Sequence, residues 1–442
     1  MTSAPDQARA AGINPLDYLR QRGYVQDVSD EQGLRAAFAA GPLTVYQGFD
    51  PSASSLHVGN LVGIMMLASL QRCGHRPIAL GGGGTALVGD PSGKTSVRKL
   101  ITPEEIERNL AGVLPQFARY LDFDGGRFGG NAPATLLNNA DWLLPLRYID
   151  FLRDIGRHFS VNEMLAVETY RQRLETTGLN FVEFNYRLVQ AYDFLHLFRE
   201  EHCLLQIGGS DQWGNIVAGV DLIRRADGAK AFALVSPLIM ASSGQKMGKT
   251  EGNAVWLDPD RTSPFDYYQY WINTDDADVG RFLRLYTFLP EERIAALTSV
   301  SGEALREAKH VLASEATALT HGTQAADDAQ ASARRRFASP QDHLLSGTSL
   351  GASAASAYLD DPAMPKTEVP STDLAVGVTL ADLFVRTGLC KSRNDARRLV
   401  AQGGLSLNGQ RIDDADALFE AEAGSAALLR AGKKRFHLVR VV

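Results

Sequence analysis

Cysteine is scarce in this chain, which has three in 442 residues. Cys73, Cys203 and Cys390 lie far apart and form no C-x-x-C pair, which argues against a disulfide framework and against a thiolate zinc site. No run of about 18 apolar residues is present, so no membrane span is expected. The first residues, MTSAPDQARAAG, lack a basic stretch followed by an apolar one, so no signal peptide is predicted and a cytoplasmic location is expected.

An excess of basic residues is also missing, since the formal net charge is -6. With 45% hydrophobic and 22% charged residues, the composition is typical of a globular protein of two to four domains. Residues 377–442 differ, with 11 Lys and Arg against 7 Asp and Glu. This basic end suggests a polyanionic partner, although a solvated charged surface would have the same composition.

A strand is predicted over 43–47 and a helix over 58–72. The stretch 45–60, VYQGFDPSASSLHVGN, leads from one to the other. In that helix Val58, Leu61 and Val62 recur at offsets of three and four and form one apolar face. His57 therefore lies at a helix N-terminus, where unpaired N–H groups favour phosphate. The alternative is that His57 only caps the helix. A second strand over 76–80 completes half of a βαβ unit, which implies a parallel sheet with ligands at its carboxyl edge.

The second strand runs into four glycines and then into GDPSGK, which holds Asp90 and Lys94. This pattern is neither G-x-G-x-x-G nor a Walker A loop, so it is weak evidence by itself. Asp90 could cap a turn or receive a substrate ammonium group. The segment 181–198 is apolar on nearly every side and predicts a buried helix with Tyr186, Gln190 and Asp193 on one face. Burying these groups unpaired would be costly, so they line a polar pocket or pair internally.

Two further loops carry polar groups. The segment 206–215, QIGGSDQWGN, predicts a strand that turns through glycines into a helix, and Asp211 is placed to accept from a ribose hydroxyl. The loop 242–250, SSGQKMGKT, carries Lys246 and Lys249 among small residues. Two ammonium groups on such a loop could close over a triphosphate, although most lysine pairs in loops are only solvated.

The rest of the chain suggests further domains. Residues 1–42 are expected to be helical and peripheral, residues 261–337 to form a helical domain, and residues 338–376, rich in Ala, Ser and Pro, to be largely a linker. In the last segment Ser392 is a plausible N-cap of a helix that presents arginines, and Asn408-Gly409 is a strong hairpin turn. A basic helix beside a small hairpin suits an RNA backbone.

Together these features resemble the bacterial tyrosyl-tRNA synthetases, a family of class I aminoacyl-tRNA synthetases, over nearly the whole chain. The stretch 57–60 is similar to the HIGH signature and 246–250 to the KMSKS loop, while the C-terminal segment resembles an S4 RNA-binding domain. Tyr46, the set 186–193 and the stretch 209–215 carry the resemblance to the tyrosyl enzymes in particular. Two positions depart from the signatures, with Asn60 in place of the second His and Gly248 in place of Ser.

The resemblance implies an α/β fold: a Rossmann-like parallel-sheet catalytic domain over 1–245 with N-terminal helices and an insertion, then the KMSKS-type loop and connector over 246–260. An α-helical anticodon-binding domain over 261–337, a linker over 338–376 and a small α+β S4-like RNA-binding domain over 377–442 would follow. The implied activity is tyrosine–tRNA ligation through tyrosyl-adenylate. Its implied partners are L-tyrosine, ATP, tRNA(Tyr) and a second copy of the chain, with neither a membrane nor DNA.

The resemblance also implies roles for individual residues. The phenol hydroxyl would be held by Tyr46 and Asp193, the ammonium by Asp90, Tyr186 and Gln190, and the carboxylate by Gln212. ATP would contact Gly48, Asp50, His57, Asn60, Gly209, Asp211 and Lys249. Pyrophosphate departure would be stabilised by Lys94, Arg98, Lys246 and Lys249, and Thr250 would be a further catalytic residue of the same loop. RNA would contact Lys391, Arg393, Arg397 and Arg398. No permanent cofactor is implied; Mg²⁺ would come with ATP, and no protein ligand for a metal can be named.

Two other functions remain open at this point. A tryptophanyl-tRNA synthetase would share the fold and both signatures, but Tyr46 with Asp193 favours a phenol over an indole. A non-catalytic RNA-binding protein with a synthetase-like body is the second alternative, and the presence of Lys246, Lys249 and Asp90 argues against it.

Overall fold

In the computed structural model the described residues are 3–90, 101–176, 178–242, 247, 249–250, 253–300, 302–337, 364–432 and 435–442. The chain divides into two compact units, Met1–Ala326 and Asp327–Val442. Within the described ranges no helix is both long and apolar enough to cross a bilayer.

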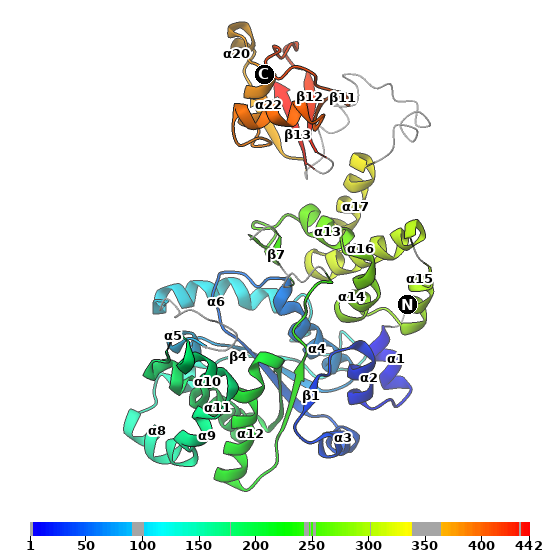
Figure 1. The fold of residues 1–442 in the computed structure, drawn as a ribbon. Coiled ribbons are helices and arrows are strands. Elements are labelled where there is room, and N and C mark those ends of the chain that lie inside the picture. Colours follow the sequence, from blue (N-terminus) through cyan, green and yellow to red (C-terminus); the bar gives the residue numbers. More distant parts are fainter. Residues whose placement is uncertain are drawn as a thin grey trace. The chain divides into compact units, whose positions relative to one another are not determined.

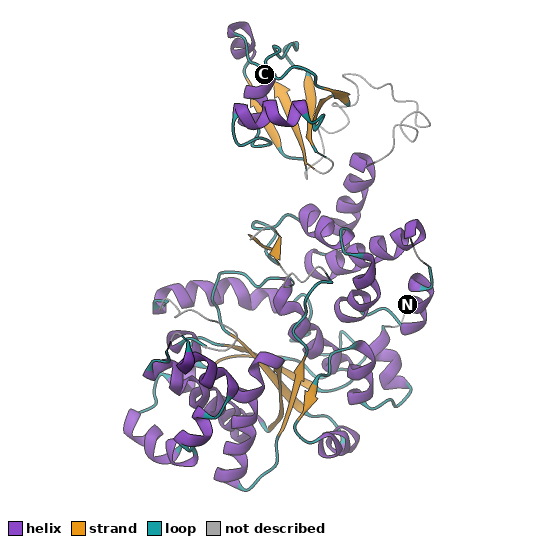
Figure 2. Ribbon diagram, viewed as in Figure 1, coloured by secondary structure: helices purple, strands orange, loops and turns teal. Residues whose placement is uncertain are grey.

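The first unit is organised on a six-stranded sheet with the order β1-β6-β5-β2-β3-β4 (Figures 1 and 2). Five strands are parallel, and the short edge strand β1 runs antiparallel to β6. The strand order reverses at β2, which lies between β5 and β3, and such a reversal is where parallel sheets bind ligands. The strands are β1 Asp27–Val28, β2 Thr44–Phe49, β3 Arg76–Gly81, β4 Thr135–Asn138, β5 Cys203–Gly209 and β6 Phe232–Ser236.

Helices cover both faces of this sheet, as expected for a Rossmann-like fold (Figure 2). On one face α11 packs against β5 and α12 against β5 and β6, and Phe194 and Leu222 belong to one core cluster with the strand residues Tyr46 and Ile78. On the other face α4 is buried from Leu61 to Gln71, because apolar residues occur on nearly every side of this helix. The main helices here are α4 Leu61–Arg72, α6 Pro103–Phe117, α11 Phe181–Glu201 and α12 Trp213–Asp227.

The remaining elements of the first unit are short. They are α1 Ala4–Ala10, α2 Pro15–Arg22, α3 Glu31–Ala40, α5 Thr85–Val88, α7 Ala140–Leu143, α8 Tyr148–Asp154, α9 Val161–Leu165, α10 Glu168–Glu175, β7 Lys249–Thr250 and β8 Asn253–Ala254. The sequence predicts that the N-terminal helices are peripheral, but the structure shows that they pack into the first unit. The Arg22 side chain is buried and donates to the backbone carbonyls of Leu283, Thr287 and Leu289, which ties α2 to the helical region.

The helical region expected over 261–337 is present. Its helices are α13 Pro264–Ile272, α14 Val279–Tyr286, α15 Glu291–Thr298, α16 Arg306–His321 and α17 Thr323–Phe337. Ser263 caps α13 as its side chain accepts from the Asp266 N–H, and the fully buried Trp271 packs against Phe282 and Tyr286. Aromatic packing thus holds α13 and α14 together.

The C-terminal unit is a five-stranded sheet with the order β11-β10-β12-β13-β9. Helices α21 and α22 pack against one face of it, in a core that includes Phe384 and Leu429 (Figure 2). The expected N-cap at Ser392 is confirmed, as is the hairpin turn, in which Asn408 and Gly409 both have positive φ. The elements are β9 Lys366–Val369, α20 Ser371–Val376, α21 Leu380–Arg386, α22 Arg393–Ala401, β10 Leu405–Leu407, β11 Gln410–Arg411, β12 Ala426–Ala431 and β13 Arg435–Val441.

One expected boundary differs from the structure. The sequence predicts that residues 366–376 belong to the linker, but β9 pairs in parallel with β13 and is followed by α20. Sequence alone missed this because KTEV is too short and polar to signal a strand until β13 is there to pair with it. Residues 338–363 of the expected linker lie outside the described residues.

Candidate functional site

A cavity of about 370 Å³ opens at the carboxyl edge of the central strands β2, β3 and β5. Its lining comes from these strand ends, from the start of α4 and from one face of α11. Twelve of the residues that the sequence singled out line this one cavity. They are Tyr46, Gly48, Asp50, His57, Asn60, Asp90, Tyr186, Gln190, Asp193, Gly209, Asp211 and Gln212.

Asp193 is a buried carboxylate on α11, with 2% of its surface exposed. One of its oxygens accepts from Asn139 Nδ2 at 2.9 Å and the other from Trp142 Nε1 at 2.8 Å. Burial raises the pKa of Asp193 to about 7, despite these two donors, and nearby Asp50 adds to the rise. Asp193 is therefore a partly protonated, hydrogen-bonded acceptor inside the site near neutral pH.

Tyr46, on β2, belongs to the core cluster that also holds Phe194 of α11, and the centres of their two rings are 5.4 Å apart. Its hydroxyl is buried and finds no hydrogen-bond partner within the part of the chain that the structure describes. Burial raises the pKa of Tyr46 well above its usual range, and the Asp193 carboxylate raises it further. A buried hydroxyl without a partner is costly, so this group is suited to bind a polar atom of a ligand.

Asp50 follows β2 and is held by two hydroxyl groups. Thr85 Oγ1 donates to it at 2.7 Å, and the Tyr186 hydroxyl donates at 3.1 Å. Gly82 is required here, since a Cβ at this position would lie 2.1 Å from Asp50 Oδ1. The Tyr186 pKa is raised well above its usual range, first by burial and then by the Asp50 carboxylate.

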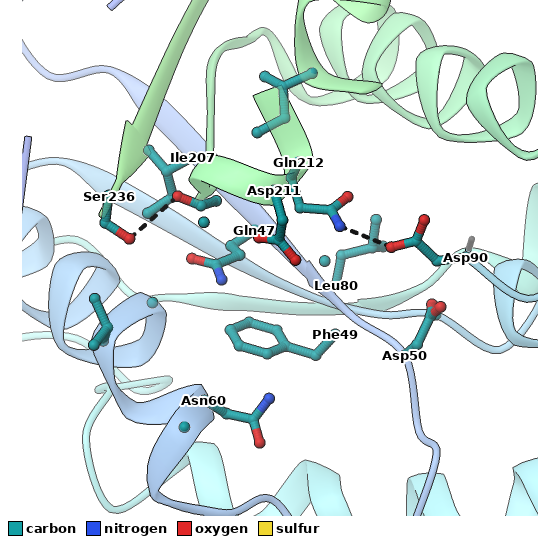
Figure 3. Close-up of a pocket in the computed structure, with 18 of the residues that line it drawn as sticks. Gln47, Phe49, Asp50, Asn60, Leu80, Asp90, Ile207, Asp211, Gln212 and Ser236 are labelled. Atoms are coloured by element: carbon teal, nitrogen blue, oxygen red, sulfur yellow. Dashed lines mark hydrogen bonds between the residues drawn. The ribbon is translucent and has the colours of Figure 1, made fainter. Parts of the chain in front are cut away.

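Asp90 and Gln212 lie side by side in the cavity lining and are joined by a hydrogen bond (Figure 3). Gln212 Nε2 donates to Asp90 Oδ2 at 2.7 Å, and Gln212 Oε1 accepts from Asn215 Nδ2 at 3.2 Å. Asp90 is buried although it is a carboxylate. Figure 3 shows Asp50, Asp90 and Asp211 facing the same space, so this end of the cavity is suited to a cationic group.

His57 and Asn60 form a reciprocal cap at the start of the helix. His57 Nδ1 accepts from the Gly59 N–H at 3.0 Å, and Asn60 Oδ1 accepts from the His57 N–H at 3.0 Å. The neutral imidazole must therefore carry its proton on Nε2. The capping alternative is thus correct for His57, and it is compatible with a ligand role, because both residues also line the cavity.

The two basic loops are described only in part. Lys94, Arg98, Lys246 and Gly248 lie outside the described residues, and for Lys249 and Thr250 only the backbone strand β7 is described. Met247 does line the cavity; its N–H donates to the Ile239 carbonyl at 3.2 Å. The 242–250 loop therefore reaches the cavity through Met247.

The structure also shows contributors that the sequence did not single out. Asn139 and Trp142 hold Asp193, while Thr85 holds Asp50 and accepts from Asn139 Nδ2 at 3.0 Å. Asn139 follows strand β4 directly, and a polar residue at the carboxyl end of a parallel strand was a usable signal. In the described ranges, no group of three or more His, Cys, Asp or Glu residues could hold a metal ion.

The four residues expected to contact RNA lie in the C-terminal unit. Arg393, Arg397 and Arg398 belong to α22, and Lys391 lies just before it; all four are exposed. Each arginine forms an ion pair within the unit, with Asp382, Asp416 and Asp395 respectively. Their positive charges are therefore largely balanced locally.

The raised pKa of Asp193 makes stability depend on pH. Between its ordinary pKa of 3.8 and about 7, the folded carboxyl holds a proton that the unfolded chain has released. The free energy of unfolding should therefore fall as pH rises through this window, by about 3 kcal/mol between pH 5 and pH 8. Urea unfolding of the wild type and Asp193→Asn at both pH values tests this, since the variant lacks the titrating group. An equal pH dependence in both proteins would contradict it.

Comparison with known proteins gives consistent results. Residues 39–338 match the family described as "tRNA synthetases class I (W and Y)", and residues 363–439 match the "Tyrosine--tRNA ligase SYY-like C-terminal domain". The chain is 54% identical to the tyrosine–tRNA ligase of Desulfosudis oleivorans, over 97% of this chain and 99% of the relative. It is 50% identical to that of Syntrophus aciditrophicus, again over 97% and 99%.

Solved structures show the same similarity. A C-terminally truncated mitochondrial tyrosyl-tRNA synthetase of Aspergillus nidulans is 32% identical, with a TM-score of 0.68 over 75% of this chain and 97% of that one. A tryptophanyl-tRNA synthetase of Aeropyrum pernix is 17% identical, with a TM-score of 0.53 over 73% of this chain and 89% of that one, and shares the fold.

Proposed function

The chain belongs to the tyrosine–tRNA ligase family, within the class I aminoacyl-tRNA synthetases, and on this premise we propose that it activates L-tyrosine with ATP and transfers the tyrosyl group to the 3′ end of tRNA(Tyr). The observation that carries the proposal is that one cavity is lined both by the buried Tyr46 hydroxyl, which has no hydrogen-bond partner among the described residues, and by the buried Asp193 carboxyl. These two groups suit a phenol hydroxyl, which both donates and accepts a hydrogen bond.

The amino acid would lie between α11 and the 80–90 segment. Its phenol would reach Tyr46 and Asp193, while its ammonium would lie near Asp90, Tyr186 and Gln190. Gln212 would face its carboxylate. Support comes from the convergence of these side chains on one cavity and from the 2.7 Å contact that orients Gln212 against Asp90.

ATP would occupy the mouth of the same cavity, over the ends of β2 and β5. Gly48, Asp50, Gly209 and Asp211 would contact it there, and His57 and Asn60 would meet its phosphates at the N-terminus of α4. Lys249, with Lys94, Arg98, Lys246 and Thr250, would stabilise the departing pyrophosphate. Mg²⁺ would arrive with ATP as part of the substrate.

The chemistry requires no nucleophile from the protein. The tyrosine carboxylate attacks the α-phosphorus of ATP, pyrophosphate leaves and tyrosyl-adenylate forms. A ribose hydroxyl at the tRNA 3′ end then attacks the acyl carbon, the ester bond to tRNA forms, and AMP leaves. The chain contributes positioning and charge stabilisation: Asp90 and Asp193 fix the two ends of tyrosine, and the helix N-terminus faces the phosphates.

The other regions would serve the tRNA, in the cytoplasm. Helices α13–α17 would form the anticodon-binding domain, and the C-terminal unit an S4-like RNA-binding domain. The proposed RNA contacts are Lys391, Arg393, Arg397 and Arg398, on α22 and just before it. The three arginines also form ion pairs within the unit.

A homodimer is part of the proposal, and exposed apolar side chains on α8 to α11 support it. These helices pack together in one small core that includes Met164, Tyr170 and Leu188. Their outer surface exposes Tyr148, Ile149, Leu152, Val161, Leu165, Leu174, Phe181 and Val182. Exposed apolar side chains gathered on neighbouring helices are typical of a contact with a second copy.

Replacing Ile149, which is 70% exposed, by aspartate should shift the protein from dimer toward monomer, because a buried charge at an apolar interface is unpaired. Sedimentation velocity across a concentration series measures the shift, and a roughly tenfold or larger rise in the dimer Kd is expected. Ile13→Asp is the matched control, since Ile13 is exposed but lies outside α8–α11. An unchanged dimer in Ile149→Asp would exclude this surface.

The activity itself is tested by exchange of labelled pyrophosphate into ATP without tRNA, with each of the twenty amino acids. Exchange with tyrosine alone is expected. Exchange with tryptophan would overturn the assignment of Tyr46 and Asp193, and no exchange in folded protein would favour a non-catalytic RNA-binding protein.

A further inference from the structure

The indole of Trp142 lies between the phenol end of the cavity and helix α11. Its Nε1 donates to Asp193 Oδ1 at 2.8 Å, so it holds one of the two oxygens of the carboxylate assigned to the phenol. Trp142 belongs to α7, a helix of four residues of which none is buried. The position of the indole therefore depends on contacts that other elements make with it.

His196 makes such a contact. Its imidazole stacks on the Trp142 ring, with the ring centres 4.3 Å apart and the ring planes inclined by 20°. His196 lies three positions after Asp193 on α11, so the two side chains are neighbours on one helix surface. The indole thus meets α11 twice, with its N–H on Asp193 and with its face on His196.

The other donor to Asp193 is held in a different way. Asn139 Nδ2 donates both to Asp193 and to Thr85 Oγ1, and Asn139 Oδ1 accepts from the Gly84 N–H at 2.7 Å. Polar contacts therefore fix both ends of that amide. An indole has only one polar hydrogen, so its orientation must come from packing of the ring. Because the N–H bond lies in the ring plane, a contact that fixes the plane also fixes the direction of the donated hydrogen bond.

The stacked pair is uncharged and lies behind the cavity lining. Burial lowers the pKa of His196, although Glu200 and Glu201 partly oppose this, so the imidazole is neutral at pH 7. Both rings are half-buried, and among the described residues the lining of the cavity includes neither of them. Stacked aromatic rings attract each other by more than the area they bury. His196 can therefore act on a substrate only through Trp142.

We propose that His196 is a positioning residue for the phenol end of the cavity. By stacking on Trp142 it fixes the indole plane, which directs the indole N–H at Asp193 and holds this carboxylate in place for the phenol hydroxyl. The inference rests on the proposed function for the identity of the substrate. It adds to the site a residue that the sequence did not single out and that does not touch the ligand.

Three full-length variants test the proposal. His196→Ala removes the ring, and His196→Phe keeps a planar aromatic ring. Glu200→Ala is the matched control, because Glu200 is exposed one turn further along the same helix. For each protein kcat and KM are measured in pyrophosphate exchange without tRNA, with tyrosine, phenylalanine and ATP varied separately. Thermal unfolding followed by circular dichroism shows whether each variant folds.

His196→Ala should lower kcat/KM for tyrosine by roughly three- to tenfold, mainly through KM, because the lost stacking loosens one of the two donors to the carboxylate. Phenylalanine lacks the hydroxyl, so its kcat/KM should stay within about twofold of wild type, as should the KM for ATP. His196→Phe and Glu200→Ala should both stay within about twofold of wild type for tyrosine.

A double-mutant cycle with Trp142→Phe separates this route from any other. Trp142→Phe keeps a ring but removes the N–H, so in that background His196→Ala has no donor to direct and should change kcat/KM for tyrosine by less than about twofold. Losses that multiply would show that His196 acts without Trp142 and would overturn the inference. An unchanged ratio of tyrosine to phenylalanine in folded His196→Ala would overturn it too, as would an equal loss in His196→Phe.

If His196→Ala does not fold, His196→Gln replaces it, since glutamine has a similar volume but no aromatic face. Wild-type protein that exchanges pyrophosphate with no amino acid would count against the proposed function itself. Normal exchange in the wild type, with no effect of the substitutions at His196, would contradict this inference alone.

Discussion

Replacing Asp193 by asparagine is expected to lower kcat/KM for tyrosine in pyrophosphate exchange by roughly 10²- to 10³-fold and to leave the low rate with phenylalanine nearly unchanged. In the structure each carboxylate oxygen accepts from one fixed donor, Asn139 Nδ2 and Trp142 Nε1. A carboxamide offers one acceptor and one donor, so its NH₂ group would face an N–H donor. The phenol would also lose a charged acceptor, and each such change in a buried site costs about 1.5 to 3 kcal/mol.

The measurement compares tyrosine with phenylalanine, because phenylalanine lacks the hydroxyl and should not register the change. Asp141→Asn is the matched control: Asp141 is exposed on α7, next to Trp142, and lies outside the cavity lining. The wild-type kcat/KM for tyrosine should also rise with pH around an apparent pKa of about 7, and the variant should lack this limb. An unchanged ratio of tyrosine to phenylalanine would remove Asp193 from phenol recognition.

The second large effect is expected at Asp90. Asp90→Asn should raise the KM for tyrosine by roughly 10²- to 10³-fold while the KM for ATP changes little, because the substrate ammonium would lose its buried counter-charge. The same substitution turns the Gln212 Nε2 contact at 2.7 Å from a charge-assisted to a neutral hydrogen bond.

Initial rates of exchange over separate tyrosine and ATP series distinguish this role from a structural one. A loss in which both KM values rise together would indicate a distorted cavity, not a missing charge. Asp141→Asn again serves as the control for the loss of one carboxylate from this unit. If tyrosine bound as tightly to Asp90→Asn as to wild type, the ammonium would have to be placed elsewhere in the cavity.

The fold class was accessible from sequence because local signals and topology agree. The helix from residue 58 carries its apolar periodicity and its His-x-x-Asn cap in adjacent residues, and the glycines after β3 mark the carboxyl edge of a parallel sheet. The set Tyr186, Gln190 and Asp193 could be placed on one face from spacing alone, since the helical repeat fixes it. The same periodicity overstated the burial of α11, where Phe181 is 66% exposed.

By itself, then, the sequence determined the order of strands and helices, the edge of the sheet that holds the site and twelve of the residues that line it. These features depend on helical and strand periodicity, on caps and on glycine, all of which act over a few residues. Only the tertiary structure decided which groups are partners. Asp193 and Asn139 are 54 positions apart, Arg22 reaches carbonyls more than 260 positions away, and Arg397 pairs with Asp416 from the other side of a hairpin. Such pairings decide whether a carboxylate shifts its pKa or an arginine keeps its charge for a ligand, because both depend on which atoms the fold brings within hydrogen-bond distance.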